Sequence, residues 1–343
     1  MKVYNKQYNQ PLQNGLRHEL QKIRLKRNFN EQTYIKEKAK KLNQYMRICN
    51  LSSCVVALSG GVDSAIVYGI IKYAQNMEDS PINTIIPVTL PALNNSGVTN
   101  QEETLIKVNE LCCKFGDTPI IIKMDSINEE IRKEVDYKLN IKGKDWAKGQ
   151  LVPYSRTSVL YYITSLLSQK DQSGIIVGTT NRDEGGYLGY VGKASDGMVD
   201  VQLISDIHKS EVYKVAHELG VPESIIKAIP TGDMYDHRID EEVFGTPYDF
   251  VELYINYLNF SDDEKREFKE SLSRFDIKQF LEFAENLENL HSYNSHKYLG
   301  LSPAVHLDLF DSSVKGGWIN YKNIYEEWLK SNEYNQNNKH PLL

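Results

Sequence analysis

Short apolar runs alternate with longer amphipathic stretches over the middle of the chain. The runs CVVAL, TIIPV, PIIIK and GIIVG are rich in Val and Ile, and segments with apolar residues at helical spacing lie between them. Such runs favour buried strands, and their alternation with helices is typical of βαβ units. The pattern therefore predicts an α/β fold, a Rossmann-like parallel sheet with helices on both faces. The helices that it indicates most clearly are residues 63–74, 101–115 and 156–168.

Both flanks of this region look helical. In the first fifty residues, apolar positions recur every three or four residues, which predicts a helical N-terminal arm at 1–50; these positions are Leu16, Leu20, Ile23, Ile35, Ala39, Leu42 and Met46. After about Ser261 we expect helices and no further strand. The central domain is predicted to span 51–310, and 311–343 to form a helical extension whose tail, NEYNQNNKHPLL, frays.

Composition and charge narrow the class of protein. A chain of 343 residues with 41% hydrophobic content can bury a sizeable core. Because its net charge is −6, we do not expect a nucleic-acid partner. No run reaches the roughly 18 apolar residues of a membrane span, and MKVYNKQYNQ lacks the apolar core of a signal peptide. The four cysteines show no C-x-x-C pair or zinc spacing. We therefore expect a cytoplasmic protein without a membrane partner.

One junction in this pattern indicates chemistry. In VVALSGGVDSAIV, an apolar strand ends at Ser59, Gly60 and Gly61, and a helix begins near Asp63. Glycines let successive backbone N–H groups converge on an anion, and the helix N-terminus adds its positive dipole. Asp63 and Ser64 stand where a P-loop has Lys, which suits Mg²⁺ held between a carboxylate and a polyphosphate. A simple strand-to-helix turn capped by Asp63 remains an alternative interpretation.

The stretch from Ser59 to Ser64 resembles the pyrophosphate-binding loop of the N-type ATP pyrophosphatases. A second region, GTTNRDEGGYLGYVGKASDGMVDVQLISDIHKSEV followed by IPTGDMYDHRIDEEVFGTPYD, is similar to NAD synthetase. The similarity runs from about Cys54 to Lys297. It implies an adenine nucleotide alpha hydrolase-like fold and a C–N-bond-forming ligase. The implied reaction is ATP-dependent amidation of nicotinic acid adenine dinucleotide (deamido-NAD) with ammonia through an acyl-adenylate, which releases AMP and pyrophosphate.

The resemblance also implies roles for individual residues. Mg²⁺ would bind Asp63 and Glu184, and Asp63 and Lys209 would be catalytic. ATP would contact Ser59, Gly60, Gly61, Asp63, Ser64, Thr179, Lys209 and Thr231. The acid substrate would contact Tyr154, Arg156, Lys193, Asp200, His296 and Lys297. The implied partners are small molecules (ATP, deamido-NAD and ammonia) and a second copy in a homodimer. Taken singly, each lysine or histidine reads as a solvated surface residue; their joint spacing favours the functional interpretation.

Two departures from the family pattern leave alternatives open. The family usually has a P/A-R-x-R segment, and here it reads Pro153-Tyr154-Ser155-Arg156, so the first arginine is missing. Tyrosine cannot form the bidentate cationic fork of arginine. An adenylating ligase for another carboxylic acid, a tRNA-modifying ATP pyrophosphatase and a non-catalytic nucleotide-binding relative therefore remain alternatives. The pair Gly185-Gly186 adds one residue after Glu184, which leaves Asp183 as an alternative ligand.

Overall fold

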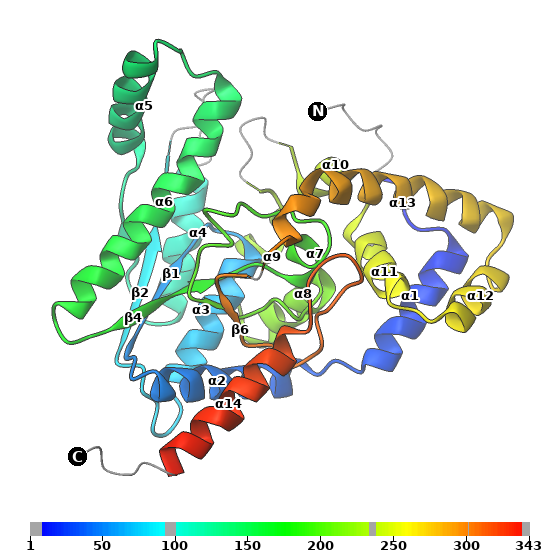
Figure 1. The fold of residues 1–343 in the computed structure, drawn as a ribbon, viewed down its shortest axis with the longest axis horizontal. Coiled ribbons are helices and arrows are strands. Elements are labelled where there is room, and N and C mark those ends of the chain that lie inside the picture. The colour runs from blue at the N-terminus through cyan, green and yellow to red at the C-terminus, as the bar shows by residue number, and fades with distance from the viewer. Residues whose placement is uncertain (1–8, 93–100, 233–237, 301, 338–343) are drawn as a thin grey trace.

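The computed structural model describes residues 9–92, 101–232, 238–300 and 302–337. Its centre is a six-stranded sheet in which every strand pair is parallel, in the order β3–β2–β1–β4–β5–β6 (Figure 1). The predicted α/β fold is thus confirmed. The strands are β1 (Ser53–Ala57), β2 (Thr84–Thr89), β3 (Ile120–Ile121), β4 (Gly174–Gly178), β5 (Val201–Gln202) and β6 (Val305–His306).

The strand order reverses once, at β1. The chain adds β2 and β3 on one side of β1, then returns so that β4 pairs with its other side, with Val55 opposite both Ile86 and Ile176. At such a reversal the two crossovers leave the sheet in opposite directions, and a crevice forms beyond the carboxyl ends of the central strands. The segments after β1 and β4 are therefore the ones that can reach a bound ligand.

Helices cover the sheet and extend it to one side (Figure 1). In chain order they are α1 (Asn14–Arg27), α2 (Glu31–Ile48), α3 (Val62–Gln75), α4 (Gln101–Lys114), α5 (Asp125–Leu139), α6 (Asp145–Ser168), α7 (Arg182–Gly185), α8 (Lys209–Glu218), α9 (Glu223–Ile226), α10 (Asp240–Phe244), α11 (Tyr248–Leu258), α12 (Asp262–Glu270), α13 (Arg274–Asn294), the 3₁₀ turn η1 (Ser295–Tyr298) and α14 (Tyr321–Asn337). The predicted N-terminal arm contains α1 and α2.

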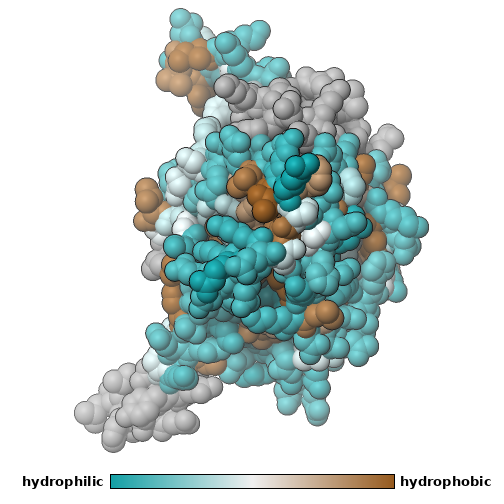
Figure 2. Space-filling view, turned by 90° about the vertical axis from the view of Figure 1, so that its right-hand side faces the viewer, coloured by the Kyte–Doolittle hydropathy of each residue, from teal (hydrophilic) through white to brown (hydrophobic). Residues whose placement is uncertain are grey.

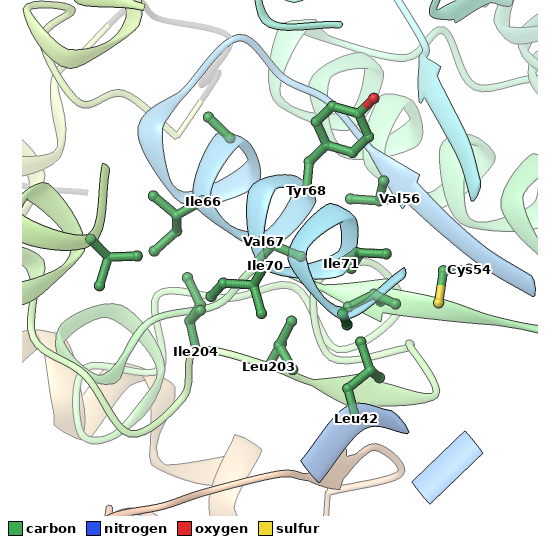
Figure 3. Close-up of a cluster of buried hydrophobic side chains, with 14 of the residues drawn as sticks. Leu42, Cys54, Val56, Ile66, Val67, Tyr68, Ile70, Ile71, Leu203 and Ile204 are labelled. Atoms are coloured by element: carbon green, nitrogen blue, oxygen red, sulfur yellow. The ribbon is translucent and has the colours of Figure 1, made fainter. Parts of the chain in front are cut away.

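Three apolar clusters hold these elements together. On one face of the sheet, α2 and α8 pack around α3, whose Ile66 and Ile70 are fully buried (Figure 3). On the other face, α6 contributes Leu160 to a smaller cluster. Beyond the sheet, α1, α11, α12 and α13 enclose a third cluster that contains Phe250 and Phe283. The side of the molecule where α12 lies is largely hydrophilic (Figure 2).

Three expectations from the pattern need correction. Helix α6 begins at Asp145 and includes Pro153, whereas the pattern predicted a helix over 156–168 only. The strand predicted at PIIIK is only two residues long. Strand β6 lies beyond Ser261, where no strand was expected. A strand of two residues is too short to show an alternation of apolar and polar positions. Backbone hydrogen bonds to Asp200 and Gln202 hold it in the sheet. Within the described residues, every helix is too short or too polar to cross a membrane. The tail expected to fray lies partly outside them, at 338–343.

Candidate active site

The glycine loop after β1 forms a compact turn at the carboxyl end of the sheet. Gly60 has φ +78°, a left-handed conformation that favours glycine. Gly61 N donates a hydrogen bond to Ser59 Oγ at 3.2 Å, and Ser59 N donates to Ser64 Oγ at 3.3 Å. Asp63 lies in the first turn of α3. Two N–H groups of the loop thus donate to serine hydroxyls. An anion could take the place of these hydroxyls as the acceptor, and the anion site predicted from the sequence stays a prediction.

The ammonium group of Lys209 lies beside this loop, between the carboxylates of Asp63 and Glu184. Lys209 Nζ is 2.6 Å from Asp63 Oδ2 and 3.1 Å from Glu184 Oε1, although Lys209 and Asp63 are 146 residues apart in sequence. Asn181 Nδ2 donates to Asp63 Oδ1 at 2.8 Å and to Glu184 Oε1 at 2.7 Å. The structure therefore brings together Asp63, Glu184 and Lys209, three residues that the resemblance selected from separate motifs.

Burial sets the electrostatics of this cluster. It raises the pKa of Glu184 to about 8, with the nearby Asp63 and Asp240 carboxylates acting in the same direction. Burial alone would lower the pKa of Lys209, but the carboxylates of Asp63 and Glu184 outweigh it and raise that pKa. The Tyr248 hydroxyl lies 2.9 Å from Glu184 Oε1 and 2.8 Å from Asp240 Oδ2. The ammonium therefore stays charged, and Glu184 is the acid whose protonated form burial favours.

The backbone around Glu184 and Lys209 is fixed by a buried acid. Asp183 Oδ2 accepts a hydrogen bond from Lys209 N at 2.7 Å, and Asp183 Oδ1 lies 2.6 Å from His208 Nδ1. Burial raises the pKa of Asp183 to about 7 and lowers that of His208 to about 3, so the imidazole is neutral. Asp183 faces the start of α8, whereas Glu184 faces the cation. Of these two acids, Glu184 is therefore the one that belongs to the cluster around Lys209.

A second group of predicted residues also comes together. Lys193 Nζ donates to the carbonyl oxygen of His296 at 3.1 Å. Lys297 Nζ donates to the carbonyl oxygens of Gly189 and Val191 at 2.7 and 2.6 Å, and burial lowers its pKa. The loop around residue 193 and the turn η1 are thus joined, although about a hundred residues separate them. Their predicted role toward the acid substrate stays a prediction.

The remaining predicted residues are more scattered. Thr179 follows β4 directly and is half-buried, while Thr231 is exposed beside residues 233–237, which lie outside the described part of the chain. Asp200 stands at the start of β5, where its Oδ2 accepts a hydrogen bond from Ile176 N at 2.7 Å. In this structure Asp200 therefore contacts the neighbouring strand rather than either cluster.

Tyr154 and Arg156, the two predicted site residues in the segment that departs from the family pattern, both lie on α6. Tyr154 is 43% exposed, and its hydroxyl lies 3.2 Å from Gln150 Oε1. Arg156 Nε donates to the carbonyl oxygen of Leu90 at 2.9 Å, which ties α6 to the end of β2. Tyr154 is thus free to change its side-chain position at little cost. Arg156 thus helps to fix α6 against the end of β2.

Sequence reasoning missed three residues of the cation cluster, namely Asn181, Asp240 and Tyr248. Asn181 had a local signal, because its side chain caps α7 by accepting from Glu184 N at 3.1 Å, and an Asn three residues before a Glu is typical of an N-cap. Asp240 and Tyr248 had none. Tyr248 is 64 residues from Glu184, and only the packing of α11 against α7 and α8 brings it to the site.

A glycine loop at the reversal point of a parallel sheet is typical of doubly wound α/β proteins, and the fold places this chain in that class. Comparison with known proteins narrows the class. The family model for NAD synthase matches residues 34–299, most of the chain, and the chain belongs to this family. The expected C–N-bond-forming ligase is thereby confirmed.

Individual relatives agree with this assignment. An NH(3)-dependent NAD(+) synthetase of Thermoplasma volcanium is 31% identical over 71% of this chain and 86% of its own length. One from Carboxydothermus hydrogenoformans is 29% identical over 64% and 84%. Among solved structures, NMN synthetase from Francisella tularensis has a TM-score of 0.63 at 21% identity and covers 80% of this chain and 99% of its own. The NH3-dependent NAD synthetase from Campylobacter jejuni has a TM-score of 0.55 at 20% identity, over 78% and 96%. These structural matches support the fold.

Proposed function

We propose that this protein amidates deamido-NAD to NAD with ammonia, at the expense of ATP, which is split to AMP and pyrophosphate. The observation that carries the proposal is the Lys209 ammonium held between Asp63 and Glu184, directly beside the glycine loop. Family membership over residues 34–299 supports the same reaction.

In the first step, an oxygen of the substrate carboxylate attacks the α-phosphorus of ATP. The bond between that phosphorus and the bridging oxygen to the β-phosphate breaks, so pyrophosphate leaves and an acyl-adenylate forms. Negative charge grows on the leaving pyrophosphate, where the N–H groups of Gly60 and Gly61 and the ammonium of Lys209 can stabilise it. This step needs positioning and electrostatics and no nucleophilic side chain.

The donor set fits a hard cation such as Mg²⁺. Asp63 and Glu184 present carboxylate oxygens to one point, where the Lys209 ammonium already finds a favourable potential. Among the described residues, no group of three or more acidic, histidine or cysteine side chains could hold a metal. Mg²⁺ would therefore take its remaining ligands from phosphate oxygens and water, which matches its usual behaviour in nucleotide sites. When bound, the ion would neutralise the polyphosphate.

In the second step, the nitrogen of ammonia attacks the carbonyl carbon of the acyl-adenylate. The bond to the AMP oxygen breaks, the amide forms and a proton is released. We propose free ammonia as the nitrogen source, because the relatives from Thermoplasma volcanium and Carboxydothermus hydrogenoformans are NH(3)-dependent NAD(+) synthetases. The purified chain should therefore work with ammonium salts, and it should fail with glutamine when ammonium is absent.

A substrate screen tests the proposal. Purified protein is supplied with ATP, Mg²⁺ and ammonium plus one acid at a time, and AMP, pyrophosphate and the amide are measured. Deamido-NAD is the expected substrate, and nicotinic acid mononucleotide is the matched smaller acid, because one solved neighbour is named an NMN synthetase. AMP release with only another acid would leave the adenylating chemistry and overturn the substrate. ATP binding without AMP from any acid would favour a non-catalytic protein.

We also propose a cytoplasmic homodimer. Phosphorylated substrates such as ATP and dinucleotides belong to the cytoplasm. Helix α5 presents Ile127, Ile131 and Val135 at a spacing of four residues, all exposed, which makes an apolar stripe along one face. A second copy could cover it. Sedimentation velocity should then report a dimer that Ile131→Glu dissociates; a parent monomer at micromolar concentration would contradict this.

A further inference from the structure

Helix α1 ends at Arg27, outside residues 34–299 that the family model matches. We propose that Arg27 is a positioning residue for Lys209: it holds the first turn of α8, and thereby the ammonium, in register with Asp63 and Glu184. The inference rests on the proposed function of this site. It assigns to the N-terminal arm a role in the reaction that its sequence does not suggest.

The contact between α1 and α8 is a two-pronged ion pair. Arg27 Nε donates to Glu211 Oε1, and its Nη2 donates to Glu211 Oε2 at 2.9 Å. The same Nη2 donates to the carbonyl oxygen of Asp206 at 2.6 Å. The side chains of Arg27 and Glu211 are only 13% and 4% exposed, so water competes little for these bonds. A planar guanidinium in this geometry fixes direction as well as distance.

Glu211 passes this constraint to the start of α8. Its Oε2 accepts a hydrogen bond from the backbone N of His208 at 2.9 Å, which closes the capping box of the helix. Lys209 is the next residue and the first of α8. From the opposite side, Asp183 accepts from Lys209 N at 2.7 Å. The turn that carries Lys209 is therefore held between Arg27 of the arm and the acid next to Glu184.

Small movements of this turn would matter for the reaction. Lys209 Nζ contacts Asp63 Oδ2 at 2.6 Å and Glu184 Oε1 at 3.1 Å, so a shift of half an ångström changes both contacts. A displacement of about 1 Å in a catalytic group can lower a rate by about a hundredfold. The acid-binding group at Lys193 and Lys297 lies on other elements. Loss of the Arg27 fork should therefore lower kcat and leave KM for the acid substrate nearly unchanged.

Arg24, one turn earlier on α1, offers a matched control. Its Nη2 lies 2.6 Å from Glu252 and 2.6 Å from Asp249, both on α11. Arg24→Ala thus removes a comparable pair of contacts between the arm and the body, and it leaves Glu211 in its capping box. Glu252 still accepts the hydrogen bond from Ser210 Oγ at 2.9 Å in the first turn of α8. If the arm merely stabilises the fold, the Arg24 and Arg27 variants should behave alike.

The test uses Arg27→Lys, which keeps the charge and cannot form the fork, and the double variant Arg27→Met with Glu211→Gln, which removes both charges of the pair and keeps an acceptor for His208 N. We expect kcat to fall about tenfold in both, with KM for the acid within about twofold. Arg24→Ala should lower Tm and keep kcat within about twofold of the parent. Parental kcat in both Arg27 variants would overturn the proposal.

A second readout needs no turnover. The full chain is labelled with an amine-reactive ester, and mass spectrometry of its peptides gives the rate at which Lys209 reacts. Lys209 is almost fully buried and ion-paired in the parent, so labelling should be slow. It should be several times faster in both Arg27 variants and unchanged in Arg24→Ala. Equal labelling in all proteins overturns the positioning role, even if the parent amidates deamido-NAD. Faster labelling in both Arg27 variants, together with a parent that amidates no acid, overturns only the proposed function.

Discussion

At the scale of single residues, the site depends on one ammonium shared by two acids. Lys209 occupies the point between Asp63 and Glu184 where a divalent cation would also bind, and Glu184 can take up a proton because burial raises its pKa to about 8. The cluster can therefore balance its charge without a ligand. A polyphosphate that arrives with Mg²⁺ would replace a balanced set of charges by another, which lowers the electrostatic cost of binding.

The carboxylate of Asp63 gives the first prediction. Asp63→Asn keeps the size of the side chain and its contact with Asn181, but it removes the charge that faces Lys209 at 2.6 Å. We expect AMP and pyrophosphate formation to fall by about a hundredfold or more, with Tm close to that of the parent. The exposed Asp171→Asn serves as the control for the chemical change. AMP release near the parental rate would remove Asp63 from the machinery.

Tyr154 gives the second prediction, on substrate choice. Because its side chain is 43% exposed and its hydroxyl contacts Gln150 on its own helix, we expect an arginine to take its place with little packing cost. One charge-assisted fork contributes on the order of 1.5–3 kcal/mol. If the pocket accepts deamido-NAD, Tyr154→Arg should amidate it with a KM equal to or below that of the parent. A clear rise in KM for deamido-NAD, with another acid still used well by the parent, would indicate a pocket built for that acid.

Residue-scale features were predictable where a motif carries them. Ser59, Asp63, Glu184 and Lys209 stood in motifs whose spacing resembles a known family, and the structure brings the last three together. Tyr248 could not be found in this way, because its contact with Glu184 depends on helices packing across 64 residues of chain. Asp200 shows the opposite case. Its place in a family motif predicted a contact with the acid substrate, but in this structure its side chain accepts a hydrogen bond from the backbone of the neighbouring strand.

At the scale of elements, the short helix α7 depends on the segment that follows β6. Trp318 N donates to the carbonyl oxygen of Gly186 at 2.9 Å, and a Cβ on Gly185 would lie 2.4 Å from the Trp318 ring. The indole thus packs directly on the backbone next to Glu184. The Gly185-Gly186 pair looked like an inserted residue in the sequence. The contact with Trp318, 132 residues after Gly186, explains why glycine stands there.

The third prediction follows from that contact. Gly185→Ala places a methyl group against Trp318 and against Thr180, where its Cβ would lie 2.7 Å from Cγ2. Overpacking of this kind costs about 1–3 kcal/mol. We expect the free energy of unfolding, measured with urea, to fall by that amount and kcat to fall with it, because Glu184 must move. Gly300→Ala is the control, since nothing lies within 4 Å of its Cβ. Equal stability of both variants would contradict the packing argument.

Elements were predictable in proportion to their length. The five-residue runs of β1 and β4 are buried and apolar, so they could be recognised without any partner. The two-residue strands β5 and β6 exist because neighbouring backbone groups pair with them, which no local pattern records. The start of α6 also depends on packing. The missing N–H of a proline usually ends a helix, but α6 continues through Pro153 while packing along β1 and β4.

At the scale of the whole molecule, helix α2 and the segment that follows β6 meet in a buried polar network outside the glycine loop. Lys38 of α2 lies 2.8 Å from Asp206 Oδ1 and donates to the carbonyl oxygen of Leu307 at 2.6 Å. Asp308, the following residue, accepts a hydrogen bond from Ser205 at 2.6 Å and another from Ser312. The arm and the segment after β6 therefore stabilise each other through the loop that leads into α8.

Asp308 gives the last prediction, on the pH dependence of stability. Burial, together with the charge of Asp206, raises the pKa of Asp308 from 3.8 to about 6, although Lys38 and the hydroxyls of Ser205 and Ser312 act in the opposite direction. An acid with a raised pKa in the folded chain contributes stability that is present below its unfolded pKa and is lost as pH rises through the folded value. Between about pH 4 and pH 6 the unfolding free energy of the parent should therefore carry a penalty that grows with pH, up to about 3 kcal/mol. Asp308→Asn keeps partners for both serines and cannot ionise, so in urea titrations its stability relative to the parent should rise steadily across this range. A difference between variant and parent that stays constant from pH 4 to pH 6 would mean that Asp308 does not titrate there.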